Sequence, residues 1–273
     1  MNAHHTEQGD FTGNGRWYVG NCIDVMKTFP DEIADMIITS PPYDNLRDYN
    51  GYSFDFEGVA KEISRILKNG RSLVWIVNDA KIDGSETLSS FKQAIFFVEE
   101  CGLKLNDTMI WNKGTFTAVG ALRRQYAPAF EYMFVFTKGD LNCFNPIKDK
   151  PNRHFGGKSC VSNRLSNGEV KKKSKRVTIG EYGQRLNVWD MPAEKTGSAK
   201  WHPARFPVSL VEDHIRSWSN KDDTILDPFM GSGTTAIAAE KTGRKWIGIE
   251  ISEDYTRKAQ KRICDFLKEE GGV

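Results

Sequence analysis

The sequence lacks the features of membrane, secreted and disulfide-linked proteins. No apolar run approaches the ~18–20 residues that cross a bilayer, and residues 1–15 contain no apolar signal-peptide core. The 273 residues include five cysteines, which are scattered and form no CxxC pair. This pattern argues against a disulfide framework or a zinc site and favours a reducing cytoplasm. We therefore expect no metal site and no membrane partner.

Charge is distributed unevenly along the chain. The net charge is +2, but residues 141–185 hold eleven Lys or Arg against three acidic residues, which leaves −6 on the rest. A basic segment on an acidic body indicates a polyanionic partner, with a solvated basic loop as the alternative. Because residues 141–200 show neither helical nor strand periodicity, we interpret this range as an insert.

Outside the insert, strand-like and helix-like segments alternate. Short apolar runs predict strands at residues 35–39, 72–78, 107–113, 131–139, 223–227 and 245–249. Apolar spacing predicts helices at residues 59–69, 88–101, 207–217 and 234–241, and a last helix capped by Ser252. This alternation predicts an α/β fold with a doubly wound, mostly parallel sheet. Residues 1–15 are expected to form a loose tail.

A glycine-rich turn, DPFMGSGTT, begins at Asp227 and leads from a strand into a helix. Such a turn lets the backbone approach a ligand, and Glu250, at the end of the next strand, is placed to accept ribose hydroxyls. The spacing of Gly231, Gly233 and Ala236 also fits a dinucleotide fingerprint. A carboxylate at the tip of the strand would repel a diphosphate but suits the ammonium of a methionine moiety. The turn therefore favours S-adenosylmethionine over NAD, and no P-loop motif is present.

A second turn, TSPPY, follows the strand at residues 35–39. Ligands bind at the carboxyl ends of strands in such sheets, so this turn is expected to face the same crevice. Two prolines remove two amide donors. The Ser40 hydroxyl and the Pro41 carbonyl remain as acceptors for an amino group, and Tyr43 offers a face for stacking. A strand that simply ends at Pro-Pro is the alternative interpretation.

Together the two motifs resemble those of amino-methylating DNA methyltransferases of the restriction–modification type. TSPPY is similar to the catalytic motif and DPFMGSGTT to the S-adenosylmethionine motif, and their circularly permuted order is that of the beta class. WHPARFP (201–207) and YVGNCIDV (18–25) resemble flanking motifs of the family. The resemblance implies a catalytic domain at residues 16–140 and 201–273, with target recognition by the insert at 141–200. It also implies double-stranded DNA as partner and a cognate restriction endonuclease as a candidate partner; a monomer and a homodimer are both compatible.

The resemblance assigns roles to individual residues. The catalytic set is Ser40, Pro41, Pro42 and Tyr43. The cofactor set is Asn21, Cys22, Phe206, Asp227, Pro228, Phe229, Gly231, Ser232, Gly233, Thr234 and Glu250. The candidates for DNA phosphate contacts are Arg153, Lys171, Lys172, Lys173, Lys175 and Arg176. Asn21 stands where the family often has Asp.

The implied reaction is methyl transfer to an exocyclic amine of a flipped base. Acceptors at Ser40 and Pro41 would favour a localised lone pair on that nitrogen. No Pro-Cys pair is present, so the nucleophile of carbon-5 methyltransferases is absent. Ser at the first position of the motif leans towards N4 of cytosine, with N6 of adenine as the alternative.

Other classes of function remain open at this stage. An NAD-dependent oxidoreductase would give the TSPPY turn no role. A non-catalytic DNA-binding protein would bind DNA without transferring a methyl group. Among methyltransferases, RNA and a protein side-chain amide are alternative acceptors, but the basic insert and the motif order favour DNA.

Overall fold

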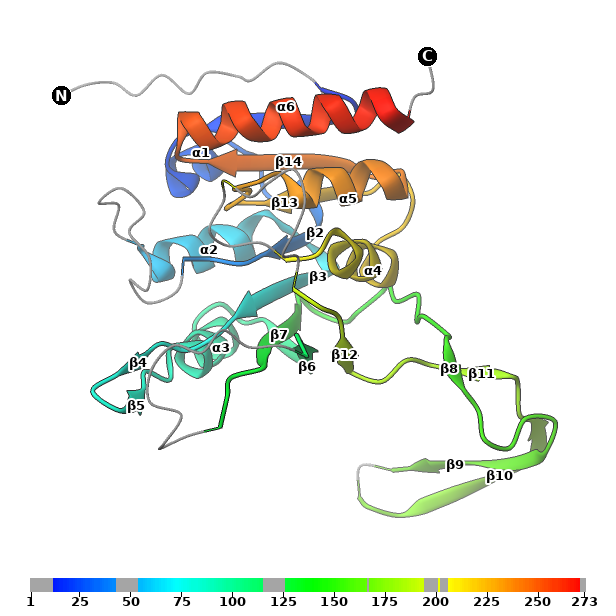
Figure 1. Cartoon of the computed structure of the whole chain (residues 1–273). Helices are drawn as coiled ribbons and strands as arrows, with labels where there is room; N and C mark the ends of the chain where they lie inside the picture. Colours follow the sequence, from blue (N-terminus) through cyan, green and yellow to red (C-terminus); the bar gives the residue numbers. More distant parts are fainter. Residues whose placement is uncertain are drawn as a thin grey trace. The chain divides into compact units, whose positions relative to one another are not determined.

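An eight-stranded sheet with the order β1-β14-β13-β2-β3-β7-β6-β12 forms the centre of the fold (Figure 1). The computed structural model describes residues 12–42, 54–114, 126–165, 167–193, 201 and 206–270, with the backbone alone for 160–164, 171–175 and 270. The strands are β1 (Gly15–Val19), β2 (Ala34–Thr39), β3 (Leu67–Val77), β6 (Lys104–Asn112), β7 (Phe130–Thr137), β12 (Val188–Asp190), β13 (Thr224–Asp227) and β14 (Lys245–Glu250). β7 runs antiparallel to β3 and β6, and the other pairs are parallel. The predicted mostly parallel α/β fold is confirmed.

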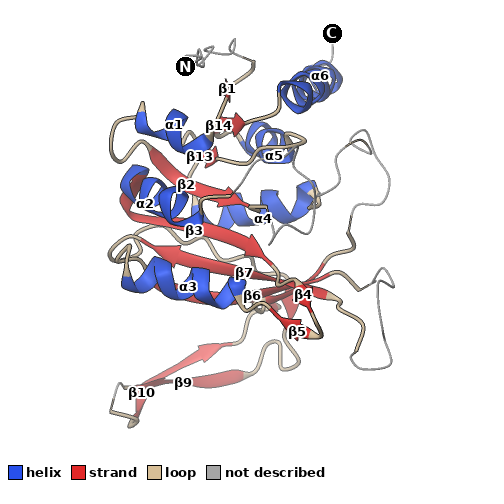
Figure 2. Ribbon diagram, turned by 90° about the vertical axis from the view of Figure 1, so that its left-hand side faces the viewer, coloured by secondary structure: helices blue, strands red, loops and turns tan. Residues whose placement is uncertain are grey.

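Three helices cover each face of this sheet (Figure 2). α1 (Cys22–Lys27), α2 (Phe56–Ile66) and α3 (Ser89–Glu99) pack on one face. α4 (Val208–Trp218), α5 (Thr234–Thr242) and α6 (Glu253–Glu270) pack on the other. No helix in the described part of the chain is long and apolar enough to cross a membrane. The central strand β2 is buried along its whole length, as expected for a strand covered on both faces.

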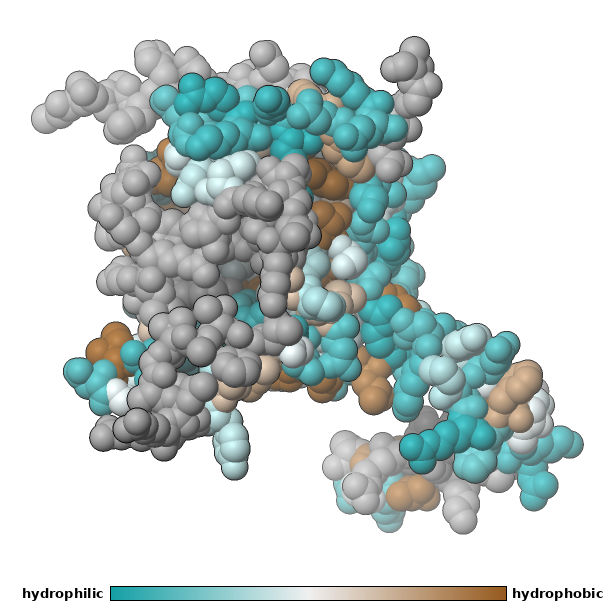
Figure 3. All heavy atoms as spheres, viewed as in Figure 1, coloured by the Kyte–Doolittle hydropathy of each residue, from teal (hydrophilic) through white to brown (hydrophobic). Residues whose placement is uncertain are grey.

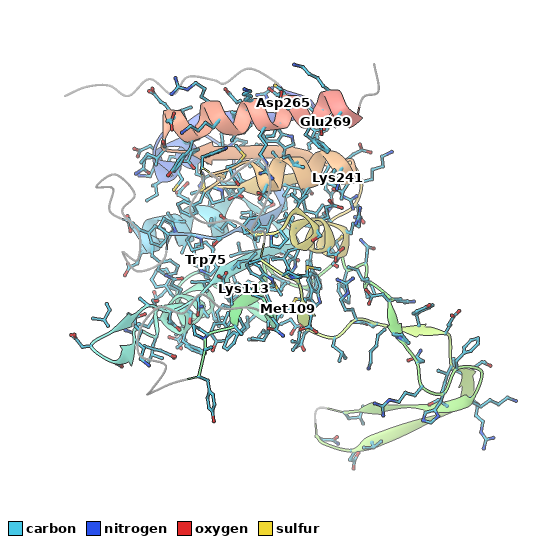
Figure 4. The ribbon with its side chains drawn as sticks, in the orientation of Figure 1. Trp75, Met109, Lys113, Lys241, Asp265 and Glu269 are labelled. Atoms are coloured by element: carbon cyan, nitrogen blue, oxygen red, sulfur yellow. The ribbon has the colours of Figure 1, made fainter. Side chains whose placement is uncertain are left out.

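Side-chain contacts tie the layers together (Figure 4). Trp75 of β3 is fully buried and donates from Nε1 to Gln93 Oε1 of α3 at 2.9 Å. Lys241 of α5 forms an ion pair with Glu212 of α4, with 2.6 Å between Nζ and Oε1. The outward face of α6 is hydrophilic, seen as the teal band at the top of Figure 3. The layers are thus joined by polar contacts at their edges as well as by the apolar core.

Local signals explain most element boundaries. Asn21 caps α1 and Asp55 caps α2, each accepting a bond from a backbone amide of the first turn. Ser252 caps α6 as predicted, because its Oγ accepts from the Tyr255 amide at 3.3 Å. The predicted end of a helix at residue 69 is wrong: α2 stops at Ile66, since Leu67 already pairs with Ala34 of β2.

The helix predicted at residues 88–101 is present as α3, but its apolar stripe faces solvent. Leu88, just before it, and Phe91, Ile95 and Val98 within it are 40–53% exposed. Ala94 and Phe97 are buried instead, with Phe97 packed against Trp75 at a ring-centroid distance of 5.2 Å. The helix is apolar on several sides, so its periodicity does not select the buried face.

Two strands of the sheet were not predicted as strands from apolar runs. β1 begins at Gly15, so the N-terminal segment ends in the sheet, while residues 1–11 lie outside the described residues. β12 lies within the range 141–200 and pairs with β6. The chain divides into two compact units, Met1–Asn145 with Asn187–Val273 and Pro146–Leu186.

The second unit, Pro146–Leu186, consists of short antiparallel strands. β8 (Lys150–Pro151) pairs with β11 (Tyr182–Gly183), and β9 (Lys158–Arg164) pairs with β10 (Val170–Thr178). The β9–β10 register shifts between Lys172 and Arg176, which marks a bulge. In the main unit, β4 (Lys81–Ile82) and β5 (Ser85–Glu86) form a small hairpin.

Candidate active site

The TSPPY turn leaves the carboxyl end of β2. Pro41 is buried and Ser40 and Pro42 are partly buried. Because β2, β13 and β14 are parallel neighbours, this turn and the loops after β13 and β14 all leave the same edge of the sheet. Tyr43 lies outside the described residues, and so does most of the loop at 44–56.

The glycine-rich turn connects Asp227 of β13 to Thr234 of α5. Gly231 and Gly233 both have left-handed backbone conformations, with φ of +49° and +78°. A Cβ at Gly233 would lie 3.1 Å from Ile263 Cδ1 and 3.4 Å from Ala259 Cβ of α6. Gly233 therefore lets the turn pack closely against α6, in addition to the predicted approach to a ligand.

Glu250 braces the outer side of this turn. Its Oε2 accepts from the Gly231 amide and its Oε1 from the Ser252 amide, both at 2.9 Å. Burial raises the pKa of this carboxyl, and the nearby Asp227 adds to the shift. The side chain is still partly exposed. A carboxylate oxygen accepts more than one hydrogen bond, so Glu250 keeps acceptor capacity for ligand hydroxyls.

Asp227 was predicted to meet the ammonium of the cofactor, and the structure shows its internal bonds. It is 1% exposed, and its carboxylate accepts from the hydroxyls of Thr39 and Thr235, each at 2.6 Å. The Phe229 amide is a third donor at 3.0 Å. Burial raises the pKa of this carboxyl, and the three hydrogen bonds oppose the shift. Contact of Asp227 with a cofactor stays a prediction.

The segment that opens α1 lies beside Glu250. The Gly20 amide donates to the Glu250 carbonyl at 3.0 Å, so β1 and β14 bring Asn21 and Cys22 to this edge. Asn21 Oδ1 is engaged in the helix cap, accepting from the Ile23 amide at 2.9 Å. Burial raises the pKa of Cys22 to about 12, so its thiol stays protonated at neutral pH.

Aromatic residues of the predicted cofactor set lie on both sides of the sheet. Phe229 packs with the α1–α3 layer and meets Phe54 edge-on, with 5.6 Å between ring centroids. Phe206, just before α4, packs against the α4–α6 layer. Trp201, from the WHPARFP segment, lies near Tyr255 of α6, 5.7 Å between ring centroids. Residues 202–205 lie outside the described residues.

Sequence reasoning missed Arg262, a buried cation behind the glycine-rich turn. It is 8% exposed, and its Nη1 donates to the Ser232 carbonyl at 3.0 Å and to Thr234 Oγ1 at 3.1 Å. One signal was available: Arg262 stands three residues after Ala259 and just before Ile263, on the apolar stripe of α6. An arginine on such a stripe indicates a buried polar partner.

These features fit a nucleoside cofactor that carries a positive charge. The turn offers a tightly packed backbone, Glu250 offers acceptors for hydroxyls, and the buried carboxyls Asp227 and Glu250 interact with each other. Among the described residues, no group of three or more His, Cys, Asp or Glu is arranged to hold a metal ion. The donor set is therefore one for an organic ligand.

The predicted DNA-contacting residues belong to the second unit. Arg153 and Arg176 are exposed there. Lys171, Lys172, Lys173 and Lys175 lie on β10, of which the structure gives the backbone only at these positions. β10 and β9 form an antiparallel two-stranded ribbon, and a ribbon of this kind fits the major groove of B-DNA. Contact of these six residues with phosphates stays a prediction.

Comparison with known proteins identifies the family. The model of the N6/N4 family described as DNA methylase matches residues 34–261. The orphan methyltransferase M.BamHII of Bacillus amyloliquefaciens is 44% identical over 244 residues, which cover 87% of this chain and 91% of that protein. The type II methyltransferase M.PvuII of Proteus hauseri is 27% identical, with coverage of 93% and 85%.

Solved structures share the fold. The cytosine-N4-specific PvuII DNA methyltransferase superposes with a TM-score of 0.69 at 21% identity and covers 97% of this chain and 96% of its own. A Thermus thermophilus protein described as a DNA modification methylase, in complex with S-adenosyl-L-methionine, gives a TM-score of 0.59 at 25% identity, with coverage of 93% and 95%. The chain therefore belongs to the N6/N4 DNA methylase family, whose members are S-adenosylmethionine-dependent enzymes that methylate exocyclic amines of DNA bases.

Proposed function

We propose that this enzyme methylates N4 of cytosine at a specific site in duplex DNA. The observation that carries the proposal is the junction at one edge of the sheet, where the Ser40-Pro41-Pro42 turn and the glycine-rich turn meet through a 2.6 Å hydrogen bond from Thr39 to Asp227. The family includes both N4- and N6-methylating enzymes. Ser40 at the head of the motif and the fold shared with the cytosine-N4-specific PvuII enzyme support cytosine. N6 of adenine is the second candidate, supported by the family alone.

In this proposal the cofactor supplies a methyl group on a positively charged sulfur. Glu250 holds the hydroxyls of the cofactor, while Gly231, Gly233 and Phe229 shape the turn against which it lies. The Ser40 hydroxyl and the Pro41 carbonyl accept the two hydrogens of the target amine. This favours a pyramidal nitrogen with its lone pair available for the methyl group, and fixed acceptors of this kind stabilise the positive charge that develops there.

Recognition of the target site is assigned to the second unit. The basic composition of residues 141–185 and the β9–β10 ribbon support this role. Arg153, Arg176 and the lysines of β10 would contact phosphates and fix the register of the enzyme on the duplex. The flipped base would be covered by the loop at 44–56, with Tyr43 stacked on it.

The partners of the enzyme remain predictions beyond the DNA itself. The relative M.BamHII is an orphan methyltransferase, whereas M.PvuII is a type II methyltransferase. We propose the cytoplasm as the compartment, and a cognate endonuclease and the monomeric or dimeric state stay open to measurement.

The proposal is tested by sequencing DNA from cells that express the enzyme, with a method that detects modified bases. We expect N4-methylcytosine at one position of a short recurring sequence. DNA from cells expressing Ser40→Ala is the matched control and should carry far less modification. Unmodified DNA from cells that contain the folded wild-type enzyme would contradict the proposal.

A further inference from the structure

One buried carboxylate connects the two motifs of the active site. Asp227 ends β13, and Thr39, which donates to its Oδ1, lies 188 residues away in the sequence and directly precedes Ser40. Thr235, which donates to Oδ2, lies in the first turn of α5, next to the glycine-rich turn. One side chain thus links the end of β2, the glycine-rich turn and the start of α5.

The geometry of this link is tightly determined. All three side chains are buried, with exposed fractions of 0% for Thr39, 1% for Asp227 and 2% for Thr235. Both hydroxyl-to-carboxylate distances are 2.6 Å, which is within the range of charge-assisted bonds. The amide of Phe229 also donates to Oδ1, so the loop and the Thr39 hydroxyl share one oxygen. A shift of the TSPPY turn relative to the glycine-rich turn would have to break a buried hydrogen bond, which is unfavourable.

We propose that Thr39 and Asp227 act as positioning residues, which hold the acceptors of the Ser40-Pro41 turn in register with the cofactor bound at the glycine-rich turn. Methyl transfer needs the amine and the methyl group in line, and a misplacement of about 1 Å can slow such a step about a hundredfold. In this view the Thr39 hydroxyl controls the rate of transfer, while Thr235 and the Phe229 amide keep the glycine-rich turn in shape for cofactor binding. The inference rests on the proposed methyltransferase function.

The experiment compares Thr39→Val with Thr39→Ser and with Thr137→Val. Valine keeps the shape of threonine but lacks the hydroxyl, and serine restores the donor. Thr137 is 2% exposed and lies near the opposite end of the sheet, opposite Ser72 of β3, so its replacement is a matched control. Three quantities are measured for each variant: the thermal unfolding midpoint, the affinity for S-adenosylmethionine by calorimetry, and the single-turnover methylation rate with saturating cofactor and DNA.

We expect Thr39→Val to slow the single-turnover rate about ten- to hundredfold and to leave cofactor affinity within about twofold. Thr39→Ser should recover most of the rate, and Thr137→Val should keep it. If Thr39→Val does not fold, Thr39→Ala, which places a smaller side chain at this position, is measured in the same way. A wild-type rate in a folded Thr39→Val or Thr39→Ala, or a Thr39→Ser as slow as valine, would overturn the inference. If the wild-type enzyme itself transfers no methyl group to DNA, the proposed function fails instead.

Discussion

Replacement of Glu250 by glutamine tests how the cofactor is held. Both carboxylate oxygens accept backbone amides, from Gly231 and from Ser252. The glutamine side chain has one acceptor oxygen and one NH2 group, so its NH2 would face one of these amides and could not accept a ribose hydroxyl. Hydrogen bonds to charged groups contribute about 1.5–3 kcal/mol. Loss of one bond to a ribose hydroxyl therefore predicts an affinity for S-adenosylmethionine about 10- to 150-fold weaker.

The affinity is measured by titration calorimetry on Glu250→Gln and on the control Glu253→Gln. Glu253 is an exposed residue at the start of α6, so its replacement should leave the affinity unchanged. A circular dichroism melt shows whether each variant is folded. If folded Glu250→Gln bound the cofactor as tightly as the wild type, the assignment of Glu250 to the ribose hydroxyls would be wrong.

Three further outcomes are expected. Because burial raises the pKa of Glu250, the accepting carboxylate is lost as pH falls through that raised value, so cofactor affinity should decline at a higher pH than an ordinary glutamate would give; calorimetry on Glu250→Gln should show no such decline. Ser40→Ala should slow single-turnover transfer about a hundredfold with nearly unchanged cofactor affinity, and an unchanged rate would remove Ser40 from the mechanism. Neutralising the β10 lysines should flatten the slope of log DNA affinity against log salt by about 0.9 for each phosphate that the enzyme no longer neutralises, and an unchanged slope would mean a merely solvated strand; the lysines are Lys171, Lys172, Lys173 and Lys175.

The sequence predicts those parts of the site that depend on local order along the chain. TSPPY and the glycine-rich turn each follow an apolar strand, and parallel strands place their carboxyl ends together, so the two turns were expected at one edge. The strands at residues 35–39 and 223–227 are present as β2 and β13. Their pairing explains how the two motifs come together.

The sequence does not predict what depends on contacts between distant residues. β12 is only three residues long and exists through its pairing with β6, so no apolar run announces it. The side chain that holds Asp227 from across the site belongs to Thr39, an ordinary strand residue. Arg262 is charged and was therefore expected on a surface, but Ser232 and Thr234 supply its partners in the interior.

The central claim is methyl transfer to N4 of cytosine, and it is tested most directly by identifying the product. Duplex DNA is incubated with the purified enzyme and S-adenosylmethionine that carries an isotopically labelled methyl group, then digested to nucleosides and analysed by mass spectrometry. We expect the label in N4-methylcytosine. Label in N6-methyladenine alone would contradict the choice of base but keep the mechanism, whereas label in 5-methylcytosine, or in no nucleoside, would contradict the account.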